Sequence, residues 1–237
     1  MGAGDRFEPA WLKGVRALPN GSEERPNDTL SNAEVGLRYS GFTAGWDYTL
    51  NAFYTWEDAP LYFNNAGTMV RKYKRAKMAG GSFSKAFGSF VLRGEGAYNF
   101  DKHFATLSPS DPEGQTEKDE GRLAVGLDYT KGDWLLSGQL FESYIADYEA
   151  GILFERVTTM ATLLLSVKLF NETLELKLLD IYGTDNKENL ARFTADYSIN
   201  DRWRIKGGLA FFNGPTNAFL GQFGDADRAE AELIFNF

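Results

Sequence analysis

The chain ends in AEAELIFNF (residues 229–237), a run in which apolar and polar side chains alternate up to the last residue. Phe237, Phe235 and Leu233 fall on one face of such a strand, and Asn236 and Glu232 fall on the other. A soluble strand buries its apolar face in a core, whereas a strand of an outer-membrane barrel turns that face to lipid. Nine residues do not distinguish these readings, so the rest of the chain must decide between them.

The composition favours an extended β protein. The 237 residues include 15% aromatics and 25 glycines but no cysteine, and the length suits one large all-β domain or two ordinary domains. A formal net charge of −8 argues against nucleic acid as a partner. No stretch approaches the roughly 20 apolar residues of a spanning helix, a test that does not apply to barrels, in whose strands every second residue is polar.

Alternation with a period of two dominates the chain and predicts eleven strands. Most are longer than the roughly five or six residues typical of soluble strands, and they match the roughly 9–11 residues that a tilted membrane strand needs. The predicted strands are 32–42, 45–57, 70–86, 89–100, 120–130, 134–146, 156–169, 173–183, 189–199, 202–213 and 226–237.

The predicted connections alternate between tight and long, which is typical of outer-membrane barrels with periplasmic turns and external loops. The tight ones are 43–45, 87–89, 131–133, 171–172 and 199–201. The long ones are 58–68, 101–119, 148–155, 184–189 and 214–225.

Aromatic residues flank the tight turns and predict a girdle at one membrane interface. We expect this girdle to contain Phe42, Trp46, Phe90, Tyr129, Trp134, Phe170, Tyr197, Trp203 and Phe237. The position of Phe237 in this set makes the chain end the periplasmic end of the last strand, and its pattern resembles the assembly signal of outer-membrane barrels.

The polar face of the predicted strands carries charges of both signs. If it lines a barrel, these charges either set the solute preference of a water-filled lumen or form an ion-pair network that fills it. The predicted lumen-facing charged residues are Arg38, Asp47, Arg75, Lys77, Lys85, Arg93, Glu95, Arg122, Asp128, Glu175, Lys177, Arg192, Asp196, Arg204, Lys206, Arg228, Glu230 and Glu232. Inward Gly36, Gly126 and Gly208 hint at open space.

Basic residues crowd the third predicted strand. We expect a local basic wall there, facing either an anionic solute or, above the membrane, lipopolysaccharide. The residues concerned are Arg71, Lys72, Lys74, Arg75 and Lys77.

The N-terminal part fits an even strand count poorly. Residues 1–31 read as an extracellular-type loop or extension before a barrel at 32–237, and no signal peptide is recognisable. Single-chain barrels have even strand counts, so either 6–18 adds a twelfth strand or further strands lie upstream. Pro9 interrupts 6–18, which favours upstream strands.

Several blocks together resemble one family of bacterial outer-membrane, porin-like barrels, classed by sequence as a domain of unknown function. They include ERPNDTLSNAEVGLRYSGFTAGWDYTLNAFYTWEDAPLYF (24–63), AGGSFSKAFGSFVLRGEGAY (79–98), GLDYT (126–130), SGQLFESYIADYEAGI (137–152) and FLGQFGDADRAEAELIFNF (219–237). The resemblance implies an outer-membrane barrel with a passage or transport role, and this chain looks like its C-terminal portion. It supplies no catalytic motif.

Catalytic signals are absent from the sequence. The single histidine, His103, begins the longest predicted loop, where a solvated side chain is the simpler interpretation than a general base. No nucleophile-elbow, zinc-protease or nucleotide-binding motif occurs, so we expect no cofactor, no metal and no enzyme.

The sequence therefore predicts an all-β, transmembrane, antiparallel up-and-down barrel of eleven to twelve strands in the bacterial outer membrane. The predicted function is passive, porin-like passage of small solutes or hydrophobic molecules. A non-conducting scaffold for a transport partner is the main alternative, and an outer-membrane hydrolase or acyltransferase is a weaker one. The expected partners are lipid, lipopolysaccharide and the barrel-assembly machinery, which would engage the C-terminal strand.

Overall fold

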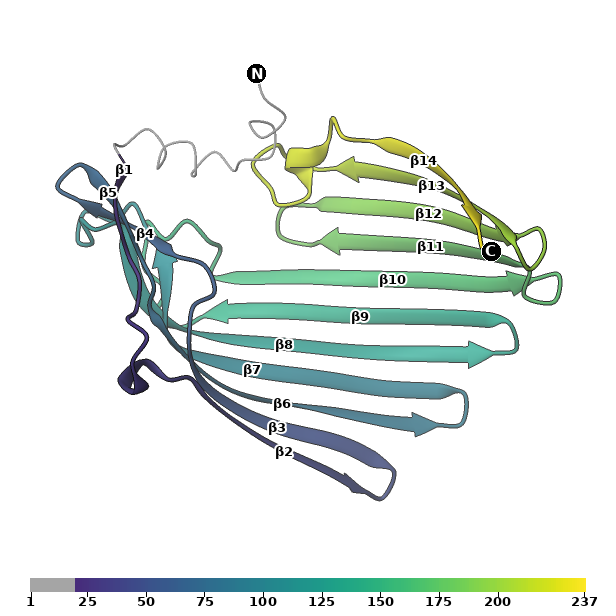
Figure 1. The fold of residues 1–237 in the computed structure, drawn as a ribbon, viewed down its shortest axis with the longest axis horizontal. Helices are drawn as coiled ribbons and strands as arrows, with labels where there is room; N and C mark the ends of the chain where they lie inside the picture. The colour runs from purple at the N-terminus through teal and green to yellow at the C-terminus, as the bar shows by residue number, and fades with distance from the viewer. Residues whose placement is uncertain (1–19) are drawn as a thin grey trace. The chain divides into compact units, whose positions relative to one another are not determined.

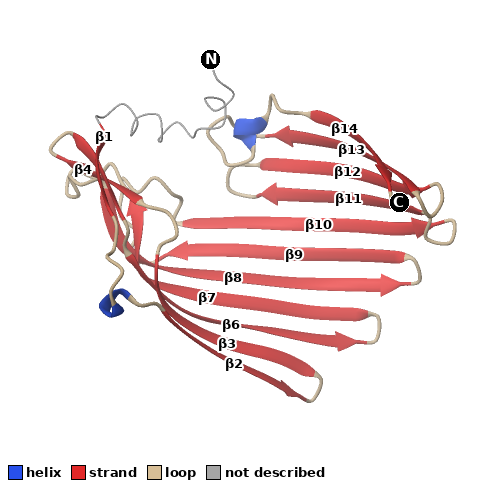
Figure 2. Ribbon diagram, viewed as in Figure 1, coloured by secondary structure: helices blue, strands red, loops and turns tan. Residues whose placement is uncertain are grey.

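The computed structural model describes residues 20–237, and its regular secondary structure consists almost entirely of β-strands (Figure 1, Figure 2). Two short 3₁₀ turns, η2 (Leu30–Asn32) and η3 (Gly221–Phe223), are its helical elements. Eleven strands form one sheet and three form a second, smaller sheet. Within the described residues, no helix has the length and apolar character required to cross a bilayer.

The large sheet is an antiparallel up-and-down arrangement in the order β14-β13-β12-β11-β10-β9-β8-β7-β6-β3-β2. Each of the eleven predicted strands is present, within a few residues of its expected bounds at most ends. The strands are β2 (Val35–Thr43), β3 (Trp46–Trp56), β6 (Arg75–Phe87), β7 (Phe90–Ala105), β8 (Gln115–Lys131), β9 (Trp134–Ile145), β10 (Val157–Leu169), β11 (Leu174–Gly183), β12 (Glu188–Ser198), β13 (Trp203–Asn213) and β14 (Arg228–Phe235).

The predicted tight turns are confirmed, and local backbone chemistry explains them. Ala44 and Gly45 join β2 to β3 with φ values of 49° and 78°. Positive φ at both central residues defines the turn type that matches the twist of a hairpin, and glycine adopts it without steric cost. Gly88 and Gly132 play the same part in the turns after β6 and β8, with φ of 59° and 56°.

The small sheet was not predicted. It has the order β1-β5-β4 and consists of β1 (Asn20–Glu24), β4 (Leu61–Asn65) and β5 (Thr68–Lys72). Residues 58–68, expected to be one long loop, thus contain β4, and 70–72 belong to β5 rather than to the third long strand. These strands were missed because five residues give too short an alternation to recognise.

The longest predicted loop, 101–119, is also shorter than expected. β7 continues to Ala105 and β8 begins at Gln115, which leaves 106–114 as the connection. Residues 20–24, placed by the sequence in an N-terminal loop, form a strand. The possible extra strand at 6–18 lies outside the described residues.

Most buried apolar side chains gather around the long connections and the strand ends that enter them, although Val167 and Ala210 are buried within the large sheet. Phe104, Ile145 and Ile152 form one cluster, against which Tyr148 packs. Phe63, Met69 and Val70 of the small sheet are 4–5% exposed. We call the small sheet, residues 104–114 and residues 145–154 the loop layer.

Packing divides the chain into two compact units. One comprises the described residues up to Phe83, Glu95–Leu123 and Glu142–Val157, and holds the loop layer. The other comprises Ser84–Gly94, Ala124–Phe141 and Thr158–Phe237, and holds strands β10 to β14.

Candidate functional site: the charged face of the large sheet

The registers of β10 to β14 sort their side chains onto two chemically different faces. Glu175 stands opposite Asp196, which in turn stands opposite Lys206 and then Glu232. One residue along, Leu176 stands opposite Ala195, followed by Gly207 and Ala231. Because successive side chains of a strand point to opposite faces, these rows define a charged face and an apolar face.

Ion pairs form on the charged face, both within a strand and between strands. Lys177 contacts Glu175 at 2.8 Å within β11, and Arg192 of β12 pairs with Glu230 of β14. Asp196 of β12 forms ion pairs with two residues of β13, Arg204 at 3.6 Å and Lys206 at 3.7 Å. Part of the charge is therefore internally neutralised, as the ion-pair alternative predicts.

A hollow of about 560 Å³ opens on this face. Its lining includes four carboxylates and three cations, namely Glu175, Asp196, Glu230, Glu232, Lys177, Arg192 and Lys206. No ion pair involves Glu232 or Arg228 within residues 20–237, so part of the charge on this face is not neutralised by a neighbouring side chain.

The inward glycines do not mark empty space, contrary to the hint taken from the sequence. A Cβ added at Gly208 would lie 2.8 Å from Glu230 Oε1, and one at Gly126 would lie 3.0 Å from Arg93 Nε. At Gly36 it would meet the Phe53 ring at 3.0 Å. These positions are small because a neighbouring side chain crosses them.

Most predicted lumen residues on the other strands also lie on the charged face. Arg93 donates to Asp128 at 3.0 Å and to Ser137 at 3.3 Å. Arg38 stands opposite Asn51, and Asp47 opposite Phe42. Glu95 follows Arg93 at a spacing of two, and alternation places it on the same face.

Arg122 belongs to a charge cluster that the sequence did not reveal. The buried carboxylate of Glu120 pairs with Arg122 at 2.9 Å and with Lys102 at 2.7 Å, and accepts a hydrogen bond from Asn99. Lys102 was assigned to a loop, so its alternation with the strand was not considered.

The prediction that Arg75, Lys77 and Lys85 share a face with the other charged residues is wrong, because β6 presents them on the apolar face. Phe83 of β6 packs against Trp46 at 5.7 Å on that face, and the odd-numbered positions of β6 follow Phe83. The hydroxyls of Ser82 and Thr49 meet on the opposite face at 2.7 Å. Small and basic residues occur on both faces of 75–87, so the sequence did not show which face of this strand is apolar.

The predicted basic wall is also wrong, because its members have separate partners. Arg71 and Lys72 lie in β5 and pair with Glu23 and Glu24. Arg75 stacks on Trp56 at 4.1 Å, and Lys77 pairs with Asp101 at 2.7 Å. Lys74 lies over the Phe63 ring at 5.1 Å. The run of basic residues is interrupted by the end of one sheet and the start of another.

The predicted girdle aromatics lie at or beside the tight turns, with one error of face. Phe42 stands opposite Asp47 on the charged face, whereas Trp46 stands opposite Thr43 on the apolar face. Phe90 packs on Tyr129 and Trp203 on Phe235, both with ring centroids 4.7 Å apart. Trp134 is the first residue of β9, and Tyr197 is the second-last residue of β12. Phe170 lies in the turn after β10, and Phe237 is fully exposed beyond β14.

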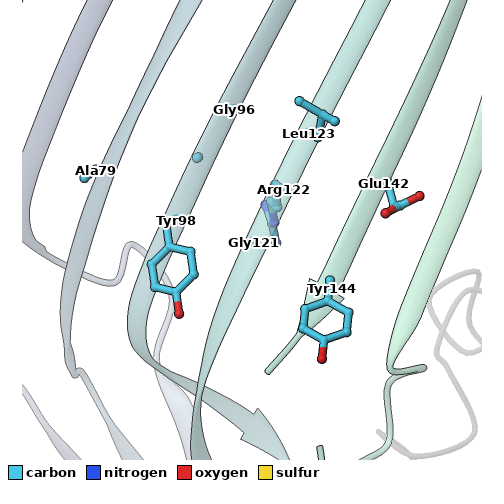
Figure 3. Close-up of a pocket in the computed structure, with 9 residues that line it drawn as sticks. Ala79, Gly96, Tyr98, Gly121, Arg122, Leu123, Glu142 and Tyr144 are labelled. Atoms are coloured by element: carbon cyan, nitrogen blue, oxygen red, sulfur yellow. The ribbon is translucent and has the colours of Figure 1, made fainter. Parts of the chain in front are cut away.

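The apolar face has its own hollow of about 400 Å³, which was not predicted. Figure 3 shows three of its lining residues, Ala79, Gly96 and Gly121, on neighbouring strands, and Tyr98 and Tyr144 also line it. Glu142 also lines it, which breaks the alternation of 134–146 in the sequence. The sequence signal that could have indicated this hollow is the occurrence of small residues on adjacent strands.

The last long connection folds onto the charged face. The buried carboxylate of Glu188 accepts hydrogen bonds from the backbone N–H groups of Leu220 and Gly221, the latter at 3.1 Å. Phe223 packs on Phe212, which stands opposite Leu190 on the charged face. Residues 214–227 are therefore an ordered loop fastened to β12 and β13.

His103 is neither a loop residue nor solvated. It lies in β7 with its side chain 9% exposed, its Nε2 3.1 Å from Glu117 Oε1 and its ring 6.0 Å from that of Phe63. Burial lowers its pKa, against the opposing effect of Glu117. No group of three or more metal-ligating side chains capable of holding an ion occurs within residues 20–237.

No known protein family and no curated protein matches the chain by sequence. Solved structures do match at low similarity. OmpT of Vibrio cholerae, an outer-membrane protein, is 16% identical with a TM-score of 0.48, over 85% of this chain and 60% of that one. An anion-selective porin from Comamonas acidovorans is 15% identical with a TM-score of 0.49, over 84% and 54%. This chain spans about three-fifths of the first of these.

The expectation that the chain is not an enzyme is corrected. Several of the matched structures bear the name OmpT and another is a porin, so these structures do not share one printed function. Their likeness to this chain concerns the fold alone, and the absence of familiar catalytic motifs is withdrawn as a reason to exclude enzymatic activity.

Proposed function

We propose that the large sheet forms an outer-membrane β-barrel of the porin-like family suggested by the sequence, and that its charged face lines a passage for small solutes or hydrophobic molecules. The observation that carries the proposal is the sorting of two faces across β10 to β14. Charged residues and a hollow occupy one face, while the other is apolar and uncovered.

The exposure of the apolar face supports a lipid environment. Leu178, Phe193 and Leu209 occupy the middle of three neighbouring strands and are 46%, 41% and 43% exposed. A water-soluble protein rarely exposes a contiguous apolar patch beyond roughly 300–600 Å². Strands of 11 residues extend about 36 Å, and a tilt near 45° reduces their rise to about 25 Å, the height of the apolar band of a barrel.

Three features fit the membrane orientation. Aromatics beside the tight turns would occupy the periplasmic interface, and the loop layer would stand outside, where lipopolysaccharide is a partner. The C-terminal strand, ending in exposed Phe237, would engage the assembly machinery. A non-conducting scaffold is the second candidate, favoured by the ion pairs that already neutralise part of the charged face.

Conductance in planar bilayers tests the passage, after a heat-modifiability gel has shown that the purified chain is folded in detergent. We expect discrete channels. A folded chain that gives no conductance would support the scaffold, and a chain that stays monodisperse without detergent would overturn the membrane proposal itself.

A further inference from the structure

The loop layer contains a pocket of about 730 Å³ that is separate from the charged face of β10 to β14. β4 and β5 form one side of it, and the end of β7 with residues 106–115 forms another. Leu153 and Phe154 complete the wall. Small-molecule sites typically have volumes of roughly 300–1,000 Å³.

Hydrogen bonds hold the wall of this loop pocket in place. The N–H of Asn64 donates to the Glu113 carbonyl at 2.8 Å, and the N–H of Leu153 donates to that of Ala105 at 2.9 Å. The side-chain amide of Gln115 donates to the Tyr62 carbonyl at 3.0 Å. Such ties preform a cavity, so a ligand would not have to order the loops when it binds.

Close backbone packing adds to this rigidity at Gly151. Its φ is 104°, and a Cβ at this position would lie 2.8 Å from the backbone nitrogen of Ser108. The N–H of Leu107 donates to the Gly151 carbonyl at 2.8 Å. The loop 106–114 and residues 151–154 are thus fixed against one another.

The lining is mostly apolar, and its titratable residues besides Tyr62 are Asp111, Glu113 and His103, whose Nε2 lies 3.1 Å from Glu117 Oε1. Leu61, Met69 and Phe154 supply apolar surface, while Asp111 and Glu113 supply two carboxylates. No lysine or arginine belongs to the lining among the described residues. Lys72 and Lys74 lie instead over the ring of Phe63, which is not part of the lining.

We propose that the loop pocket binds small aromatic amines, with the ring among the apolar side chains and the ammonium group toward Asp111 and Glu113. Neither Asp111 nor Glu113 has an ion-pair partner within residues 20–237, and two such carboxylates in one lining favour a cation over an anion of the same shape. The inference goes beyond the passage proposed above, since binding here needs no open lumen.

Calorimetry on the full chain in detergent micelles tests the proposal with three ligands of nearly equal size: benzylamine, benzyl alcohol and benzoate. We expect benzylamine to bind at least tenfold more tightly than benzoate, with benzyl alcohol between them. Equal affinities for all three, or tighter binding of benzoate, would overturn the proposal.

Two variants separate the pocket from partition into detergent. Ala105→Phe fills the pocket and should weaken benzylamine binding by at least tenfold, whereas Ala229→Phe on the apolar face of β14 should leave it unchanged. Exposed Glu113→Gln should reduce the preference for benzylamine over benzyl alcohol without loss of benzyl alcohol binding. Unchanged binding and preference in Ala105→Phe and Glu113→Gln would place the ligand elsewhere and refute the proposal.

Discussion

The loop layer and the large sheet solve the problem of apolar surface in opposite ways. In the loop layer, Phe104 and Ile145 are 3% and 2% exposed, as in a water-soluble core. In the large sheet, Leu178 and Leu209 remain over 40% exposed, although they lie in the middle of long, regularly paired strands. One region is stabilised by burial within the chain, and the other needs an apolar environment outside it.

The largest expected effect comes from the core of the loop layer. Phe104→Ala removes a ring that packs with Ile145, Ile152 and Phe154, and should cost about 3–5 kcal/mol of local stability. Hydrogen exchange should accelerate in residues 104–107 and 150–154. The heat-modifiability shift of the large sheet should persist. If the shift disappears as well, the two regions fold as one and the comparison fails.

A charge on the apolar face should have the next largest effect. Leu178 stands between Leu165 and Phe193, so Leu178→Arg should cost about 2–4 kcal/mol in lipid vesicles, as lipid-facing charges do near the bilayer midplane. The measurement is the free energy of unfolding in urea.

The matched control is Thr194→Arg on the charged face, opposite Lys177 and Gly208. It should cost less than about 1 kcal/mol beyond the repulsion from Lys177. Equal losses for the two variants would mean that lipid does not contact the apolar face.

The two regions also differ in how far the sequence predicts them. Strands of eight or more residues carry enough alternation to be located, which is why β2, β3 and β6 to β14 were all expected. In β4 and β5, five residues each give no period, and their pairing with β1 depends on contacts distant in the chain. The charged face was likewise predictable where alternation is regular: Arg192 and Asp196, four residues apart in β12, were expected on one face and share it.

The errors of face occur near strand ends. Lys85 and Phe42 lie beside turns, where too few alternating residues remain to show which face of the sheet a side chain occupies. Lys77 and Arg75 lie near the loop layer, where long cationic side chains can cover aromatic rings, as Arg75 covers Trp56. The pairings of Glu120 and Glu188 could not be read at all, because each depends on a partner brought close by folding.

The fastening of the last loop gives a smaller effect. Glu188→Ala leaves two buried N–H groups without an acceptor, which should cost about 1–3 kcal/mol. Because the loop lies on the charged face, release of residues 214–227 should also change channel conductance and its noise. Protease cleavage within this loop reports the release. Glu232→Ala, on the same face but without an ion pair in the described chain, is the control and should leave cleavage unchanged.

The smallest effect on stability is expected at the Arg192–Glu230 pair, and it gives the sharpest test of what the charged face does. The two side chains are 41% and 47% exposed, so Arg192→Gln should cost less than about 1 kcal/mol. It nevertheless leaves Glu230 uncompensated beside the hollow, and a passage lined by this face should then become more permeable to cations. Reversal potentials in a salt gradient measure the change, and Arg192→Gln combined with Glu230→Gln should return the ratio toward that of the original chain. If the single variant changes no permeability ratio while channels still open, solutes do not cross this face, and the ion pairs serve only to hold its strands together.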